Sequence, residues 1–185
     1  MLPGLFLDRD GVIIEHRPNY VRSWEEVVIL PQALRALASI RSSPLRVVIV
    51  TNQSAIGRGL ISAEVSDEID RRLLHEIEAA GGRVDGIFVC PHRPEAGCSC
   101  RKPRPGLILQ AAQALNIDLP GSTLVGDNLS DLQAGQAAHV STLALVKTGL
   151  GEEQSQVPCP KGLGEFLVFA DLEDALRNLI SNRRI

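Results

Sequence analysis

The chain has 185 residues, of which 44% are hydrophobic and 22% charged, as expected for one globular domain, residues 1–185, with a substantial core. A net charge of −3 and an aromatic content of only 3% argue against nucleic-acid binding, which needs a basic surface and often stacks bases on aromatic rings. No apolar run reaches the roughly 18–20 residues of a membrane span, and the N-terminus lacks the basic and apolar regions of a signal peptide, so we expect a cytoplasmic protein without membrane contact.

Apolar, β-branched runs alternate along the chain with segments of helical periodicity. In chain order, strands are predicted over residues 5–7, 46–51, 86–90, 122–125, 143–146 and 167–170. The run 47–50 is apolar on both faces, as in a central parallel strand. Helices are predicted to begin at Pro31, Pro105 and Leu129, and after the capping residues Ser62 and Asp171. The alternation predicts an α/β fold with a doubly wound, mostly parallel, Rossmann-like sheet.

Two segments near the C-terminus differ from this pattern. Residues 149–164 are rich in Gly, Pro, Ser and Gln, and we predict a surface loop there that carries Cys159 as a free thiol. Arg183 and Arg184 are expected at a solvated helix end.

Polar side chains follow four of the predicted strands, at the point where each strand ends. Asp8 and Asp10 follow the first strand. Those that follow the second, third and fourth strands are Thr51, Asn52, Gln53 and Ser54; Arg101 and Lys102; and Asp127, Asn128 and Asp131. Because the carboxyl ends of parallel strands meet at one edge of a sheet, we expect these side chains to form one site.

The chemistry of these groups favours phosphoryl transfer. Two carboxylates as close as Asp8 and Asp10 repel each other unless a cation lies between them, and their hard oxygen atoms suit Mg²⁺. Hydroxyl and amide donors suit phosphoryl oxygens, and a lysine offsets the remaining negative charge.

The same residues resemble a known set of motifs. Asp8-Arg9-Asp10-Gly11, Thr51-Asn52, Lys102 and Gly126-Asp127-x-x-x-Asp131 are similar, in order and spacing, to the four motifs of the haloacid dehalogenase superfamily. The resemblance spans residues 8–131 and implies the fold of that superfamily, a Mg²⁺-dependent phosphatase and an aspartyl-phosphate intermediate. The short connections between the predicted elements agree with a minimal cap.

The resemblance also assigns a role to each motif. Asp8 is expected to be the nucleophile that attacks phosphorus, and Asp10 the acid that protonates the leaving oxygen and then activates water. Thr51 and Asn52 are expected to bind the phosphoryl group, and Lys102 to neutralise its charge.

Magnesium is expected to bind at the same edge. Its ligands would be the Asp8 carboxylate, the backbone carbonyl of Asp10 and Asp127, while Asp131 is either a further ligand or supports one. Asp131 alone would also suit a helix cap, because it falls in a first helical turn.

Three of the four cysteines lie close together with a histidine. The set Cys90, His92, Cys98 and Cys100 matches the Cys₃His ligands of tetrahedral Zn²⁺ sites, although its spacing is tighter than in zinc fingers. Four protein ligands leave no open position, so we predict a structural Zn²⁺ that fixes the zinc loop, residues 90–102, which presents Arg101 and Lys102 to the phosphate. The alternative is a group of thiols without metal, which the compact spacing disfavours.

Within the superfamily, the zinc loop resembles that of two families, the heptose-bisphosphate phosphatases and the histidinol-phosphatases. The segments NYV at 19–21 and TNQSAIGRG at 51–59 are closer to the heptose family, whereas histidinol-phosphatases usually carry an acid in place of Ser54. The closer resemblance implies hydrolysis of the C7 phosphate of heptose 1,7-bisphosphate, a step toward cell-surface glycans such as lipopolysaccharide. The expected substrate contacts are Asn19, Tyr20, Asn52, Gln53, Ser54, Arg58, Arg101 and Asn128.

Other interpretations stay open at this point. Arg58 and Arg101 suit a second phosphate, but Arg58 suits a solvated loop equally well, and many heptose phosphatases carry lysine where this chain has Asn128. Histidinol-phosphatase is the first alternative, and a nucleic-acid 3′-phosphatase or a non-catalytic phospho-ligand binding module are more remote ones. We expect a monomer that acts on a small phosphorylated sugar.

Overall fold

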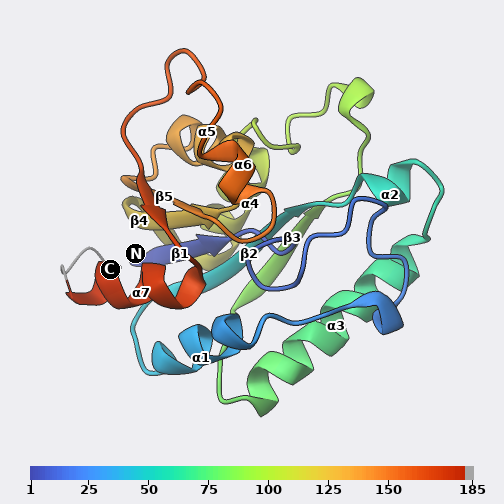
Figure 1. The fold of residues 1–185 in the computed structure, drawn as a ribbon, viewed down its shortest axis with the longest axis horizontal. Helices are drawn as coiled ribbons and strands as arrows, with labels where there is room; N and C mark the ends of the chain where they lie inside the picture. The colour runs from blue at the N-terminus through green and yellow to red at the C-terminus, as the bar shows by residue number, and fades with distance from the viewer. Residues whose placement is uncertain (182–185) are drawn as a thin grey trace.

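Six parallel strands form one sheet in the computed structural model, which describes residues 1–181 (Figure 1). The spatial order is β3-β2-β1-β4-β5-β6. The strands are β1 (Leu2–Leu7), β2 (Arg46–Asn52), β3 (Gly86–Cys90), β4 (Ile117–Gly126), β5 (Thr142–Val146) and β6 (Leu167–Phe169). The strand order reverses between β1 and β4, so the carboxyl ends of these two central strands meet where doubly wound sheets bind their ligands.

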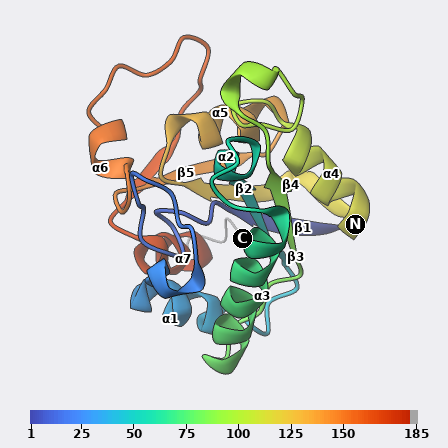
Figure 2. The ribbon, with the colours of Figure 1, turned by 90° about the vertical axis from the view of Figure 1, so that its right-hand side faces the viewer.

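Helices cover both faces of the sheet (Figures 1 and 2). One face carries α1 (Pro31–Ser39), α3 (Ala63–Ala79) and α7 (Leu172–Ser181), and the other carries α4 (Gly106–Leu115) and α5 (Leu129–Ala137). The connections contain short elements: the 3₁₀ turns η1 (Trp24–Glu26) and η2 (Pro94–Ala96), and the one-turn helices α2 (Ser54–Gly57) and α6 (Gly151–Gln154). Across residues 1–181, no helix combines the length and apolar content that crossing a bilayer would require.

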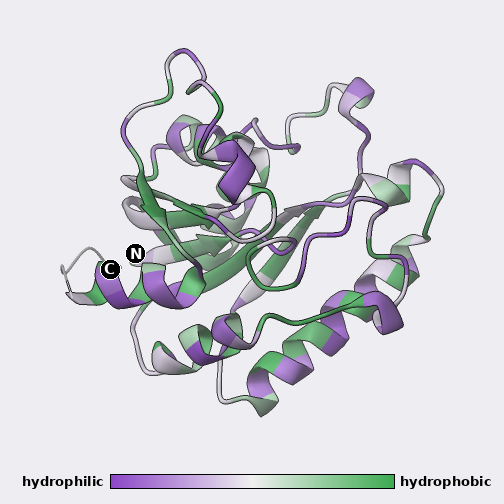
Figure 3. Cartoon of the chain, viewed as in Figure 1, coloured by the Kyte–Doolittle hydropathy of each residue, from purple (hydrophilic) through white to green (hydrophobic). Residues whose placement is uncertain are grey.

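The apolar core fills both sides of the sheet. Successive residues of a strand point to opposite faces, so Val47 and Ile49 of β2 belong to the core under α1, α3 and α7, whereas Val48 and Val50 belong to the core under α4 and α5. All four side chains are buried. Burial on both faces explains why this strand is apolar along its length, and Figure 3 shows the same hydrophobic character in the central strands.

The structure confirms the predicted alternation of strands and helices, and the sheet is entirely rather than mostly parallel. Ser62 begins α3 by accepting a hydrogen bond from the Val65 backbone at 3.3 Å. Asp171 precedes α7 and accepts a hydrogen bond from the Asp174 backbone at 2.9 Å. Both capping predictions are therefore confirmed.

Some boundaries differ from the sequence prediction. β4 begins at Ile117, where its first residues pair with β1, although Pro120 and Gly121 are poor strand formers. The helices α2 and α6 are absent from the prediction because a single turn carries no periodicity, and α6 lies in the predicted loop. Cys159 is an exposed free thiol in the remainder of that loop, as predicted, and Arg183 and Arg184 lie outside the described residues.

Candidate active site

A pocket of about 280 Å³ opens at the carboxyl edge of the sheet. The predicted site residues that line it are Asp8, Asp10, Tyr20, Thr51, Asn52, Gln53, Ser54, Arg101, Lys102, Asp127, Asn128 and Asp131. His16 and Arg17, from the loop that follows β1, line it as well. Asn19 and Arg58 are exposed and are not part of the pocket wall. The parallel topology therefore brings the four predicted motifs to one place.

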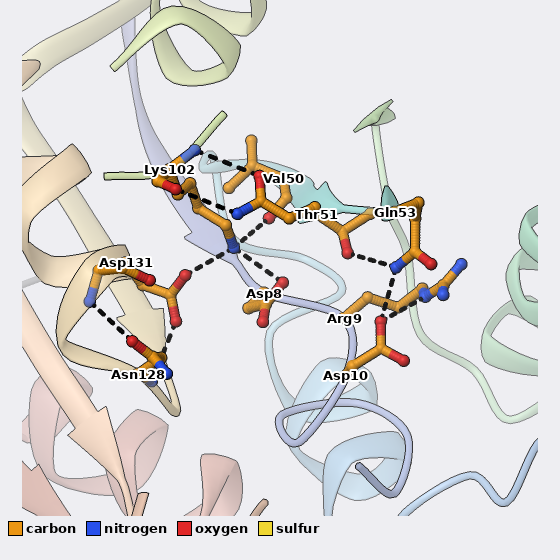
Figure 4. Close-up of polar contacts among 11 residues, drawn as sticks. Asp8, Arg9, Asp10, Val50, Thr51, Gln53, Lys102, Asn128 and Asp131 are labelled. Carbon is orange, nitrogen blue, oxygen red and sulfur yellow. Dashed lines mark hydrogen bonds and ion pairs between the residues drawn. The ribbon is translucent and has the colours of Figure 1, made fainter. Parts of the chain in front are cut away.

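Lys102 lies at the centre of the polar contacts (Figure 4). Its Nζ is 2.9 Å from Asp8 Oδ1 and 2.6 Å from Asp131 Oδ1, and it donates a hydrogen bond of 2.8 Å to the Val50 carbonyl. Burial alone would lower the pKa of Lys102, but the two carboxylates outweigh it and raise the pKa. The lysine therefore stays charged and is held directly beside Asp8.

Asp8, Asp127 and Asp131 form a cluster of carboxylates at the ends of β1 and β4. Each offers an oxygen atom within 4.8 Å of the others. Burial, opposed by Lys102 and reinforced by nearby carboxylates, raises the pKa of Asp8 to about 6. Burial and the charges of Asp8 and Asp131 raise the pKa of Asp127 to about 8. One lysine offsets only one of three negative charges, so these hard oxygens fit a divalent cation.

The backbone encloses the Asp127 carboxylate closely. Its Oδ2 accepts a hydrogen bond from the Leu150 backbone at 2.8 Å. Gly11 has a φ of +85°, and a Cβ at this position would clash with the Asp127 side chain. The glycine after Asp10 is therefore needed both for the turn and for the approach of the two strand ends.

Asp131 uses its two oxygens for different partners. Oδ1 pairs with Lys102, while Oδ2 accepts a hydrogen bond from the Asn128 backbone at 3.0 Å. Asn128 Oδ1 in turn accepts one from the Ser130 backbone at 2.9 Å, which completes a capping box at the start of α5. Asp131 thus caps its helix and also orients the lysine.

Asp10 is held on one side by two donors. Its Oδ2 accepts hydrogen bonds from Gln53 Nε2 at 2.8 Å and from Arg9 Nε at 3.1 Å (Figure 4). Gln53 Nε2 also donates to Thr51 Oγ1 at 2.8 Å. Gln53, predicted to contact substrate, therefore contacts two residues predicted to be catalytic. Arg9 is not among the residues predicted from the sequence, although its position between two strand-end acids indicates an ion pair there.

Asn52 connects the end of β2 to the zinc loop. Its Oδ1 accepts a hydrogen bond from the Lys102 backbone, and its Nδ2 donates one to the Lys102 carbonyl, both at 3.2 Å. In the structure, the Asn52 side chain fixes the backbone that carries Lys102. Its predicted contact with a phosphoryl group stays a prediction.

Cationic and phenolic groups lie around the pocket mouth. A hydrogen bond with Ser54 and the charges of Arg58 and Arg101 lower the pKa of Tyr20. The guanidinium of Arg101 donates to the His92 carbonyl at 3.3 Å, which ties it to the zinc loop. Arg101 therefore adds positive charge to a pocket that also contains the carboxylates of Asp8, Asp127 and Asp131.

The four predicted zinc ligands converge. The Sγ atoms of Cys90, Cys98 and Cys100 are 3.3–3.7 Å apart, and His92 Nδ1 is 3.6 Å from Cys90 Sγ and 3.3 Å from Cys100 Sγ. A tetrahedral ion with metal–sulfur bonds of about 2.3 Å needs sulfur atoms roughly 3.8 Å apart, so the cluster could hold Zn²⁺. Burial raises the pKa of the Cys90 thiol to about 12. The thiol therefore keeps its proton at neutral pH, and a bound metal would displace that proton.

Comparison with known proteins agrees with the class that the fold and the site define. A family model described as "HAD-hyrolase-like" matches residues 99–175, which places this part of the chain among the haloacid dehalogenase-like hydrolases. The D-glycero-beta-D-manno-heptose-1,7-bisphosphate 7-phosphatase of Pseudomonas aeruginosa is 38% identical over 168 residues, which are 91% of this chain and 92% of that protein. The protein of the same name from Bordetella bronchiseptica is 40% identical over 159 residues, 85% and 88% of the two chains.

A solved structure extends the likeness to three dimensions. The crystal structure of D,D-heptose 1.7-bisphosphate phosphatase from B. bronchiseptica, complexed with magnesium and phosphate, matches with a TM-score of 0.90 at 37% identity. The match covers 98% of this chain and 99% of that one. The chain therefore belongs to the D-glycero-beta-D-manno-heptose-1,7-bisphosphate 7-phosphatase family, as the sequence resemblance implied.

Proposed function

We propose that the chain is a Mg²⁺-dependent phosphatase that removes the C7 phosphate of D-glycero-β-D-manno-heptose 1,7-bisphosphate. The observation that carries the proposal is the convergence of Asp8, Lys102, Asp127 and Asp131 in one pocket, in a chain whose relatives bear this name. The relative solved with magnesium and phosphate supports both as occupants of the site.

Three groups of this chain would hold the magnesium ion. They are the carboxylates of Asp8 and Asp127, which belong to one cluster, and the backbone carbonyl of Asp10, which the family resemblance adds. Asp131 would support them through Lys102. The bound ion supplies positive charge next to the phosphoryl oxygens. Because burial raises the pKa of Asp8 and of Asp127, the ion would compete with protons for these two carboxylates as the pH falls.

Asp8 and Asp10 divide the chemistry between them. An Asp8 oxygen attacks phosphorus, the bond from phosphorus to the C7 oxygen breaks, and Asp10 donates a proton to that oxygen. Heptose 1-phosphate leaves, and Asp8 carries the phosphoryl group. Asp10 then takes a proton from a water molecule whose oxygen attacks phosphorus, which releases inorganic phosphate and restores Asp8. Thr51 and Lys102 oppose the charge on the phosphoryl oxygens during both steps.

The second phosphate of the substrate binds at the pocket mouth. Arg101 lines the mouth, and Arg58 is close enough to lower the pKa of Tyr20. Guanidinium groups suit a phosphate because they donate two parallel hydrogen bonds. The same charges disfavour histidinol phosphate, whose amine is positive and would need an acidic partner. The charge at the mouth therefore favours the bisphosphate over the alternative substrate.

We also propose a monomeric, single-domain enzyme of the cytoplasm with a structural Zn²⁺ in residues 90–102. The cluster of three thiols supports this location, because thiolate ligands persist in a reducing compartment and become disulfides elsewhere. The product would serve the synthesis of heptose-containing glycans.

A side-by-side comparison of kcat/KM tests the substrate. The candidates are the β and α anomers of heptose 1,7-bisphosphate and histidinol phosphate, each with Mg²⁺. We expect kcat/KM for the β anomer to exceed that for histidinol phosphate by at least about 100-fold. A pocket whose arginines pair with a second phosphate leaves the positive amine of histidinol phosphate without a partner. A preference for histidinol phosphate would overturn the assignment.

A further inference from the structure

Arg9, between the two carboxylates of the first motif, is a buried cation with two anionic partners. Only 1% of its surface is exposed. Its Nε is 3.1 Å from Asp10 Oδ2, and its Nη1 is 2.7 Å from Oδ1 of Asp70, a residue 61 positions away on α3. One guanidinium therefore links the catalytic edge of the sheet to a helix on its face.

Asp70 is anchored by the helix that carries it. It lies on the buried face of α3, together with Ile69, Leu73 and Ile77 in the core. Burying an ion pair of this kind is costly, because both charges lose their hydration. The pKa of Asp70 is raised by burial in spite of the opposing charge of Arg9. A pair of apolar side chains would fill the space as well, so the charges call for another explanation.

The geometry at Asp10 supplies that explanation. Both of its side-chain hydrogen bonds in residues 1–181, from Arg9 and from Gln53, fall on Oδ2. Asp10 is one of the residues that line the pocket. Donors on one oxygen stabilise negative charge there, so a proton on this carboxyl group resides on Oδ1. The orientation of the carboxyl plane then decides whether that proton meets the substrate.

We propose that Arg9 and Asp70 are positioning residues for Asp10: Asp70 holds Arg9, and Arg9 holds Asp10 Oδ2 so that Oδ1 delivers its proton to the leaving oxygen. The inference rests on the proposed role of Asp10 as the general acid. It assigns to an ion pair between the segment that follows β1 and helix α3 a function that neither residue performs by touching the substrate.

Leaving-group dependence separates this role from a merely structural one. A sugar alkoxide leaves poorly without a proton, whereas 4-nitrophenolate leaves readily as the anion. The ratio kcat/KM includes only steps up to the departure of the first product, so it reports the acid step and not the later attack of water. A structural defect would lower kcat/KM alike for both substrates. A misplaced acid would lower chiefly kcat/KM for the sugar phosphate.

The experiment compares heptose 1,7-bisphosphate with 4-nitrophenyl phosphate as substrates of the Mg²⁺-loaded protein. Asp70→Asn is the main variant, and the double variant Arg9→Met/Asp70→Leu replaces both charges with apolar groups in case one unpaired charge prevents folding. Asp10→Asn calibrates the loss of the acid. Glu173→Gln is the matched control, because it breaks the exposed pair of Arg35 and Glu173 between α1 and α7.

We expect Asp70→Asn and the double variant to lower kcat/KM for the heptose substrate about 10- to 100-fold, and that for the aryl substrate less than about threefold. Glu173→Gln should leave both unchanged. Equal losses on both substrates in the Asp70 and double variants, or no loss, would overturn the inference while Asp10→Asn still discriminates. If Asp10→Asn lowers kcat/KM equally for both substrates, the proposed role of Asp10 as the general acid is contradicted as well.

Discussion

At the scale of single residues, the site concentrates negative charge that one lysine cannot balance. Asp8 and Asp131 pair with Lys102, and Asp127 lies beside these two carboxylates. Burial raises the pKa of Asp8 to about 6 and that of Asp127 to about 8. Both values exceed the 3.8 of the free side chain. Without metal, these two groups therefore bind more protons in the folded protein than in the unfolded chain between about pH 4 and pH 8. Their contribution to the free energy of unfolding falls as the pH rises through this interval.

Magnesium should stabilise the protein more at high pH than at low pH. At pH 8 the bound ion relieves the repulsion between ionised carboxylates. At pH 5.5 the ion must first displace protons from the same carboxyl groups. We expect the rise in Tm on adding Mg²⁺ to be at least about twice as large at pH 8, by differential scanning calorimetry at constant zinc content. An equal rise at the two pH values would contradict the burial-based pKa shifts.

At the scale of elements, the zinc loop and the end of β2 form one support for the lysine. Cys90 ends β3, the other ligands follow within the loop, and Asn52 bonds both the backbone nitrogen and the carbonyl of Lys102. Irregular backbone of this kind has little core of its own, so we expect a bound metal to order it. The position of Lys102 would then depend on metal ligands that do not contact the phosphate.

Loss of one zinc ligand should lower stability and activity together. We expect Cys100→Ser to reduce the zinc content from about one ion per chain, to lower Tm by about 5–10 °C and to lower kcat at least about tenfold. Elemental analysis, calorimetry and a phosphatase assay measure the three effects. Cys159→Ser, which removes an exposed thiol outside the cluster, is the control. A zinc-free Cys100→Ser protein with the parent's Tm and kcat would show that the metal does not support this loop.

The elements also show what periodicity can predict. The buried strand β2 and the long helix α3 are predictable because burial repeats along them. The early start of β4 depends on pairing with Leu2 and Pro3 of β1, and the helices α2 and α6 are single turns. Such features depend on neighbours in space rather than on a local pattern, so a sequence alone does not indicate them.

At the scale of the whole molecule, a parallel sheet converts a linear series of motifs into one site. The expected parallel sheet predicts that Asp8, Thr51, Lys102 and Asp127 meet at one edge, and the pocket confirms it. The contacts of individual side chains could not be predicted in this way. Arg9 reaches Asp70 on α3, a contact between residues 61 positions apart that no motif spacing encodes. Residue types and topology were therefore predictable, whereas the contacts that orient them required the structure.

In the proposed mechanism, Asp8 receives the phosphoryl group and Asp10 is needed to release it. Asp10→Asn should therefore accumulate phosphorylated protein with 4-nitrophenyl phosphate, a substrate that transfers its phosphoryl group without an acid. Mass spectrometry of peptides after an acid quench locates the group. We predict a burst of about one 4-nitrophenol per chain with the phosphoryl group on Asp8, and neither in the double variant Asp8→Asn/Asp10→Asn. A phosphoryl group on another residue, or a burst that persists without Asp8, would contradict the account.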